Sequence, residues 1–76
     1  MATMQQSEEF SVPKGTVIFQ RGDQGEEMYL VAAGEVRLLI GEGDHRTEVA
    51  RLGPGEFFGE LSLLSGAPRN ATAEAV

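Results

Sequence analysis

The sequence predicts a small all-β domain, either a sandwich or a barrel. Short stretches rich in β-branched and aromatic residues recur at a spacing of roughly eight to twelve residues, which is typical of these architectures. Turn signals separate the stretches, and most of them rest on the ten glycines of the chain. A length of 76 residues and a hydrophobic content of 41% indicate one compact domain rather than a disordered segment.

We expect six or seven strands in this domain. The clearest are residues 10–12, 16–20, 27–33, 36–40, 46–52 and 70–76. Residues 27–33 are apolar on both faces, so this strand is expected at the centre of a sheet. A period of two places Val36, Leu38 and Ile40 inward on the next strand. Val49 is the clearest inward residue of the strand after the second hairpin.

Glycine and proline mark the turns between these strands. The turns are expected at residues 13–15, 22–25, 34–35, 41–44 and 53–56. The last of them leads into Phe57 and Phe58, and we expect both rings to pack into the core. Met28 and Tyr29 are also most simply explained as core residues.

The two ends of the chain carry different patterns. Residues 1–9 are polar and show no period, so we expect a disordered leader that is not a signal peptide. Residues 10–76 are expected to form the domain. Residues 70–76 alternate weakly between small and polar side chains. We expect a last strand there whose edge is open over residues 71–76, and such an edge can pair with another copy.

The charge pattern and the composition exclude several kinds of partner. The formal net charge is −6 and the six Lys and Arg residues are scattered, so a nucleic acid is not an expected partner. No apolar run approaches the length of a membrane span, so we expect no membrane contact by this segment. The absence of cysteine rules out disulfides and thiolate metal sites and agrees with a cytoplasmic location.

The inventory of reactive side chains argues against catalysis. His45 is the one histidine, and it stands beside Asp44 at a polar hairpin tip, where a solvated loop residue is the simplest interpretation. A metal-dependent enzyme built on a β-barrel needs two or three converging imidazoles, which this chain lacks. No cysteine is present, and no serine has an evident base partner. We therefore expect no enzyme activity, no metal and no cofactor.

The last third of the chain gathers an acid and an arginine around one turn. Gly59 permits close backbone approach, and a short helix beginning at Glu60 would point its first free N–H groups outward, toward an anion. Pro68 ends this helix and sets the direction of Arg69, whose guanidinium can bind a phosphate or carboxylate bidentately. Glu60 beside an anion is unfavourable unless the same ligand donates a hydrogen bond to it, as a sugar hydroxyl does.

Two segments of the last third resemble a known family. Residues 58–64, Phe-Gly-Glu-Leu-Ser-Leu-Leu, and residues 68–72, Pro-Arg-Asn-Ala-Thr, resemble the phosphate-binding cassette of cyclic nucleotide-binding domains. The segments that resemble the family's first strands and turns are residues 15–23, 28–31 and 34–36. The resemblance covers about residues 10–76 and is far more specific than a lone glycine-rich loop.

The resemblance implies a particular β fold and indicates which part of the family's domain this sequence contains. It implies a jelly-roll-like β-roll with one short helix in the phosphate-binding cassette. Family members carry a helix before the first strand, and they continue after the cassette with another strand and two helices. We therefore expect this sequence to be a partial domain that is truncated after the cassette.

The resemblance also implies a ligand, cAMP or cGMP, and its contacts. Glu60 would take the ribose 2′-OH, and Arg69 the exocyclic oxygens of the cyclic phosphate. Backbone amides complete the cradle, with the hydroxyls of Ser62 and Thr72 as further donors. The candidate ligand-binding residues are Phe58, Gly59, Glu60, Leu61, Ser62, Arg69, Asn70, Ala71 and Thr72. Asn70 stands where family members often have Ala, Thr or Ser, which leaves the choice between cAMP and cGMP open.

Two functions from different classes are compatible with the sequence. The first is a regulatory module in signal transduction that binds a cyclic nucleotide without chemical turnover, through Gly59, Glu60 and Arg69. The second is a structural or interaction module that binds nothing in the cassette and forms a homo-oligomer through open strand edges. Without the cassette around them, Arg69 would be an ordinary surface arginine and Glu60 an acid favoured by the helix dipole. Titration with cAMP separates the two functions.

Overall fold

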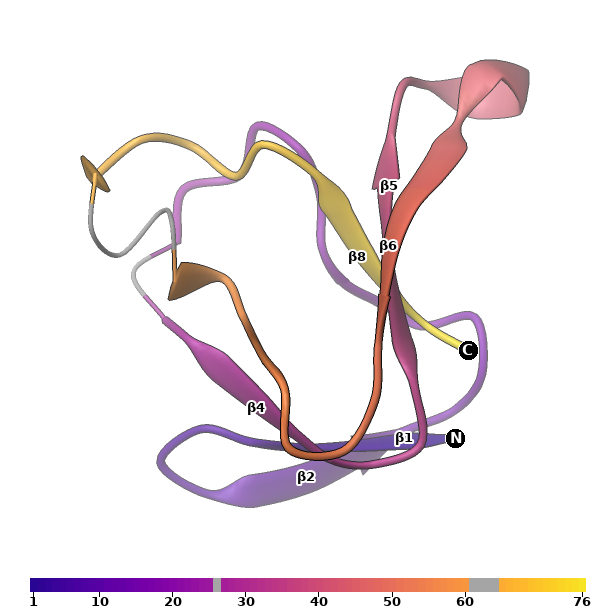
Figure 1. Cartoon of the computed structure of the whole chain (residues 1–76). Helices are drawn as coiled ribbons and strands as arrows, with labels where there is room; N and C mark the ends of the chain where they lie inside the picture. Colours follow the sequence, from indigo (N-terminus) through magenta and orange to yellow (C-terminus); the bar gives the residue numbers. More distant parts are fainter. Residues whose placement is uncertain (26, 61–64) are drawn as a thin grey trace.

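The computed structural model describes residues 1–25, 27–60 and 65–76, which form eight strands and one short helical turn. The strands are β1 (Ala2–Gln5), β2 (Glu9–Val12), β3 (Val17–Phe19), β4 (Tyr29–Ala33), β5 (Val36–Ile40), β6 (Thr47–Leu52), β7 (Phe57–Phe58) and β8 (Thr72–Ala75). Two four-stranded antiparallel sheets result, one in the order β2-β1-β4-β7 and one in the order β3-β8-β5-β6 (Figure 1). The 3-10 turn η1 (Gly43–His45) lies at the tip of the β5–β6 hairpin. The expected all-β, jelly-roll-like β-roll is confirmed.

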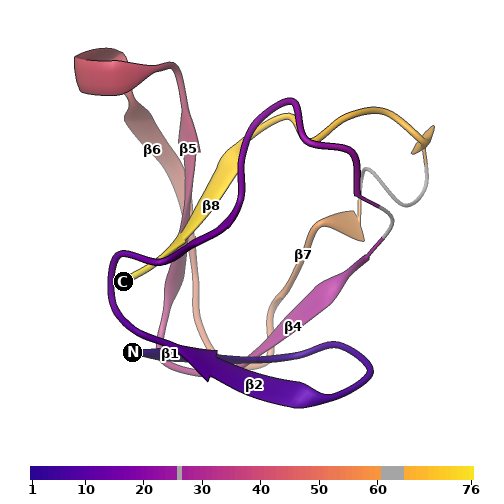
Figure 2. The ribbon, with the colours of Figure 1, turned by 180° about the vertical axis from the view of Figure 1, so that it is seen from behind.

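The last strand, β8, lies inside its sheet and not at an edge. Antiparallel pairing joins it to β3, with Val17 opposite Glu74, and to β5, with Arg37 opposite Glu74. Figure 1 and Figure 2 show β8 beside β5 from both sides. The open edge expected over residues 71–76 is therefore wrong. Local sequence pattern indicates that a segment is extended, but it does not indicate which distant strands become its neighbours.

The first residues of the chain form a buried strand. Ala2 and Met4 are fully buried and alternate with more exposed residues along β1. This strand pairs with β2, and with β4, where Met4 stands opposite Val31. The expectation of a disordered leader is wrong for residues 2–5. Two inward positions in a polar segment are too short a pattern to recognise, and the pairing with β4 that stabilises them is long-range.

The core lies between the two sheets. Its buried members come from β1, β4, β5, β7 and β8, and they are Ala2, Met4, Tyr29, Val31, Val36, Phe58, Ala73 and Ala75. Three of the eight are alanines, which contribute little volume, so the rings of Tyr29 and Phe58 supply much of the apolar surface that stabilises the domain.

A β-bulge on β6 shifts its register against β5. Leu38 stands opposite Ala50 and Leu39 opposite Glu48, which leaves Val49 as the extra residue. The Val49 side chain is 53% exposed. The expectation of an inward Val49 is wrong, because a strict period of two does not hold across a bulge.

The alternation expected for β5 breaks at the same bulge. Val36 is fully buried, as expected, and Leu38 packs against the core from a partly buried position. Leu39 is buried as well, whereas Ile40 is 43% exposed. The prediction of an inward Ile40 is therefore wrong.

The two phenylalanines of β7 face opposite ways. Phe58 is 1% exposed and Phe57 is 52% exposed, because successive side chains of a strand alternate between its faces. The expectation that both rings lie in the core is confirmed for Phe58 and wrong for Phe57. Met28 and Tyr29 divide in the same way, since Tyr29 is buried and Met28 is 39% exposed.

The short helix expected in the cassette falls on residues 61–64, which lie outside the described residues. Within the part of the chain that is described, no helix has the length and apolar character needed to cross a membrane.

Candidate functional site

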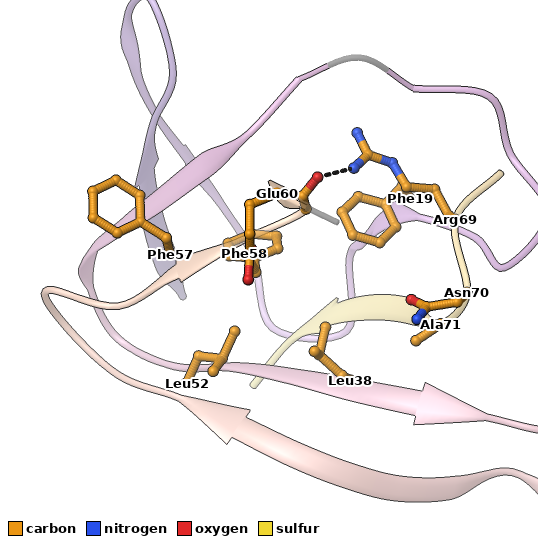
Figure 3. A pocket seen from close by; sticks show the side chains of 10 residues that line it. Phe19, Leu38, Leu52, Phe57, Phe58, Glu60, Arg69, Asn70 and Ala71 are labelled. Atoms are coloured by element: carbon orange, nitrogen blue, oxygen red, sulfur yellow. Dashed lines mark hydrogen bonds between the residues drawn. The ribbon is translucent and has the colours of Figure 1, made fainter. Parts of the chain in front are cut away.

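A cavity of about 150 Å³ is walled by both sheets at the point where β7 leads into the cassette (Figure 3). Strands β3, β5 and β6 contribute from one sheet and β7 from the other. The lining residues are Phe19, Leu38, Leu52, Phe57, Phe58, Gly59, Glu60, Arg69, Asn70 and Ala71. The cavity therefore combines apolar walls with one carboxylate, one guanidinium and one carboxamide.

The backbone of Arg69 is fixed to the turn that follows β3. The Arg69 N–H donates to the carbonyl oxygen of Asp23 at 2.8 Å, and the Gly22 N–H donates to the carbonyl oxygen of Arg69 at 2.7 Å. The Asp23 carboxylate closes the turn itself by accepting from the Gln20 N–H at 2.9 Å. The Arg69 side chain thus starts from a backbone position that is held on both sides.

The guanidinium of Arg69 is buried, with the residue only 4% exposed. Nη1 donates to the Gly59 carbonyl oxygen at 2.9 Å, drawn as a dashed line in Figure 3, and Nη2 donates to the Glu27 carbonyl oxygen at 2.8 Å. Among the described residues, Nε has no hydrogen-bond partner. Two carbonyl dipoles therefore hold the cation, and neither of them neutralises its charge.

Two glycines leave room for this guanidinium. A Cβ on Gly59 would lie 2.8 Å from Nη1 of Arg69 and 2.9 Å from the Glu27 carbonyl oxygen. Gly59 also has a φ of +87°, in the region that favours glycine. A Cβ on Gly25 would lie 2.6 Å from Nε of Arg69. The close backbone approach expected at Gly59 is present, and the group that approaches is the arginine side chain.

Aromatic rings lie directly behind the site. Phe58 stacks on Tyr29 with ring centroids 5.1 Å apart, and Phe19 lies 5.9 Å from Phe58. The Tyr29 hydroxyl donates to the Glu27 carboxylate at 3.2 Å. Burial raises the pKa of Tyr29, and the negative charge of Glu27 raises it further. The phenol therefore stays protonated at neutral pH and acts as a hydrogen-bond donor.

The structure brings most of the predicted site residues together. Those that line the cavity are Phe58, Gly59, Glu60, Arg69, Asn70 and Ala71. Thr72 is buried away from this lining, and its Oγ1 accepts a hydrogen bond from the Arg21 N–H at 3.1 Å. Leu61 and Ser62 lie outside the described residues. His45 is exposed in η1, and the described residues contain no cluster of metal-ligating side chains.

Sequence reasoning missed the apolar wall of the cavity. Phe19, Leu38, Leu52 and the exposed Phe57 all line it. Their strands carry no local signal for this role, because a strand residue that faces a cavity has the same pattern as one that faces the core. The separation of Phe57 from Phe58 would have been found by applying strict alternation to the two-residue strand.

Comparisons with known proteins agree on one family. The family model of the cyclic nucleotide-binding domain matches residues 9–76. The cyclic AMP receptor protein of Thermus thermophilus is 54% identical over 67 residues, which cover 84% of this chain and 30% of that protein.

Two solved structures extend the comparison. The regulatory domain of Toxoplasma gondii PKA, solved with cAMP, superposes with a TM-score of 0.83 at 37% identity, covering 96% of this chain and 27% of that one. The EAL enzyme Bd1971, solved in cAMP-bound and cGMP-bound forms, superposes with a TM-score of 0.80 at 28% identity, covering 95% of this chain and 18% of that one.

This chain spans 30% or less of the length of each of these proteins. The match to the family model nevertheless includes every strand from β2 to β8 and all of the cavity-lining residues. The chain therefore belongs to the cyclic nucleotide-binding domain family.

Proposed function

We propose that this chain is a regulatory module that binds cAMP or cGMP in the cavity beside Arg69 and does not turn it over chemically. The observation that carries the proposal is the position of a buried guanidinium and a half-buried carboxylate, Glu60, on the lining of one small cavity with apolar walls. A ligand with one phosphate, one ribose hydroxyl and one flat apolar base matches these groups. The relatives that are described as cAMP receptors or were solved with cAMP support it.

Arg69 is proposed to hold the cyclic phosphate. A guanidinium carries five N–H donors, and the Gly59 and Glu27 carbonyls each take one of them. Nε has no partner among the described residues, so donors remain for phosphate oxygens. Asn70 and Ala71 line the same cavity, and their backbone amides would add neutral donors.

Glu60 is proposed to accept the hydrogen bond of the ribose 2′-OH. An ionised carboxylate accepts hydrogen bonds and has none to donate, so Glu60 needs a donor on the ligand. Leu61 and Ser62 complete the proposed contact set through their backbone or hydroxyl donors. Thr72 stays outside it, because Thr72 does not line this cavity.

The base is proposed to lie against the apolar wall formed by Leu38, Leu52 and Phe57. Phosphate and ribose fix the ligand at one end, and apolar contact shields the base at the other. The cytoplasmic location expected from the sequence remains part of this proposal, since cyclic nucleotide signals reach their receptors there. The alternative function, a homo-oligomer formed through an open edge at residues 71–76, is no longer supported, because β8 is paired with a strand on each side.

Calorimetric titration of the 76-residue chain with cAMP and with cGMP tests the proposal. We expect saturable binding of at least one nucleotide at one site. Arg69→Ala should weaken that binding by about 2–4 kcal/mol, because a buried, charge-assisted contact is removed.

Arg21→Ala is the matched control, because Arg21 is exposed and does not line the cavity. It removes the same charge and should leave the affinity unchanged. Circular dichroism of each variant confirms that it is folded. Absence of saturable heat with both nucleotides, or equal affinity of Arg69→Ala and the unaltered chain, would overturn the proposal.

A further inference from the structure

We propose that Phe19 is a positioning residue, which holds the Arg69 guanidinium in place by a cation–π contact and so sets the affinity for the anionic group of the ligand. This inference rests on the proposed function. The Cζ atom of Arg69 lies over the Phe19 ring, 4.3 Å from its centroid, well inside the roughly 6 Å limit of an effective contact. Cation–π contacts are strongest where water is excluded, and Arg69 is only 4% exposed.

The ring compensates the buried charge without competing with a ligand. The ion pairs found among the described residues do not include Arg69. A carboxylate in this position would satisfy the cation, but it would also occupy the N–H donors that a phosphate needs. An aromatic face attracts the cation through its quadrupole and takes none of the in-plane N–H groups. Phe19 thus stabilises the charge and leaves Nε without a partner among the described residues.

The position of the ring is itself fixed by the fold. Phe19 stands opposite Ala73 in the pairing of β3 with β8, and Arg69 lies shortly before β8 in the chain. The ring packs against Tyr29 at 6.1 Å and against Phe58 at 5.9 Å between centroids. The backbone bonds from Arg69 to the turn after β3 fix the other partner. The ring is therefore held by β3, and the cation by the segment before β8, which is bonded to the turn after β3.

The space around the guanidinium leaves it little freedom to move off the ring. Gly59 and Gly25 border it so closely that a Cβ on either would lie within 2.8 Å of a guanidinium nitrogen. With the two carbonyl hydrogen bonds, the Phe19 ring completes an enclosure that fixes the plane of the group. Loss of the ring alone is expected to let the guanidinium tilt while its hydrogen-bond acceptors stay in place.

Phe19 also lines the cavity and packs in the core, so the experiment must separate three roles. Phe19→Leu removes the ring and keeps an apolar side chain. Phe10→Leu is the matched control, because Phe10 is another partly buried ring, which contacts Tyr29 at 6.2 Å but does not line the cavity. Both variants should lower stability in urea denaturation.

Only Phe19→Leu should weaken cAMP binding, by about five- to thirtyfold, with Phe10→Leu changing the affinity by less than about twofold. Phe19→Tyr keeps the aromatic face and should restore the affinity to within about threefold of the unaltered chain. In the Arg69→Ala background, Phe19→Leu should cause no further loss, because the cation that it positions is gone.

Each outcome decides a separate point. If the unaltered chain binds neither cAMP nor cGMP, the proposed function fails before Phe19 is tested. If it binds and Phe19→Leu binds as tightly, the positioning role is refuted. A loss that persists undiminished in the Arg69→Ala background would also refute it, since Phe19 would then contact the ligand directly. Should Phe19→Leu fail to fold by circular dichroism, Phe19→Met, which is closer in volume and carries no ring, replaces it with the same expectations.

Discussion

Replacing Phe58 by leucine should destabilise the domain far more than the same change at Phe57. Phe58 is 1% exposed, stacks on Tyr29 at 5.1 Å and lies 5.9 Å from Phe19, whereas Phe57 is 52% exposed. Each aromatic pair contributes about 0.5–1.5 kcal/mol beyond the area it buries. Loss of two pairs therefore costs about 1–3 kcal/mol at Phe58, and a half-exposed side chain changes stability by about 0.5 kcal/mol or less.

The cost at Phe58 is large beside the total stability of a chain of this length. A domain of 76 residues is expected to have a free energy of unfolding of about 4–11 kcal/mol. Leucine is chosen because alanine would remove about 3–5 kcal/mol and would leave much of the protein unfolded.

Urea denaturation followed by circular dichroism measures both variants. With a slope of about 1 kcal/mol per molar for a domain this small, Phe58→Leu should lower the midpoint by about 1–3 M and Phe57→Leu by less than about 0.5 M. The slope itself should stay constant, which shows that both variants unfold from the same native state. Equal midpoints for the two variants, or a larger loss at Phe57, would refute the assignment of opposite faces to β7.

Three further outcomes are expected. Glu60→Ala should weaken cAMP binding by less than Arg69→Ala does, and in competition binding it should abolish the preference for cAMP over its 2′-deoxy analogue, because the hydroxyl loses its acceptor. Competition should also show cAMP and cGMP within about tenfold of each other, since the apolar wall at the base offers no hydrogen bond to distinguish them; a preference of a hundredfold or more would require a base-reading group. Hydrogen bonding to Arg51 lowers the pKa of Glu48 from its ordinary value of 4.5. The ionised Glu48 carboxylate therefore stabilises the fold above pH 4.5, and this stabilisation is lost as the pH falls through the lowered pKa. Thermal melts of Glu48→Gln should therefore fall below those of the unaltered chain near neutral pH and converge with them in acid, and an equal gap at both would contradict the linkage.

The positions of the strands along the sequence could be predicted better than the strands with which each of them pairs. Predicted strands at residues 27–33 and 36–40 correspond closely to β4 and β5, because β-branched and aromatic runs bounded by glycine are local signals. The interior position of β8 and the burial of β1 depend on pairing with strands far away in the chain. The outward turn of Val49 depends on a bulge, which a strict period of two cannot represent.

Part of the predicted cassette lines the cavity, and most of the apolar wall of the cavity was not predicted. Gly59, Glu60 and Arg69 are close in sequence and share a motif, and the structure places them around one cavity. Phe19 and Leu38 reach the same cavity from β3 and β5, and an apolar strand residue carries no sign of what it faces. The motif therefore predicted that Glu60 and Arg69 lie close together, and only the three-dimensional arrangement shows that Phe19 and Leu38 line the same cavity.

Arg69 joins three segments that the chain brings together from different places. Its backbone is bonded to Gly22 and Asp23 after β3, and its guanidinium to the carbonyls of Glu27 before β4 and Gly59 after β7. A phosphate bound as proposed would take the guanidinium N–H donors that these two carbonyls leave open. Ligand binding and the placement of both segments would then depend on one group. Coupling of this kind is reciprocal. If a shift of the Glu27 or Gly59 backbone changes the affinity for the ligand by some factor, the ligand changes the equilibrium of that backbone shift by the same factor. β4 and β7 are paired with each other, and the two carbonyls lie just outside this pair, Glu27 before β4 and Gly59 after β7. If the site binds a ligand as proposed, this strand pair is the element that would pass its occupancy to the rest of the domain.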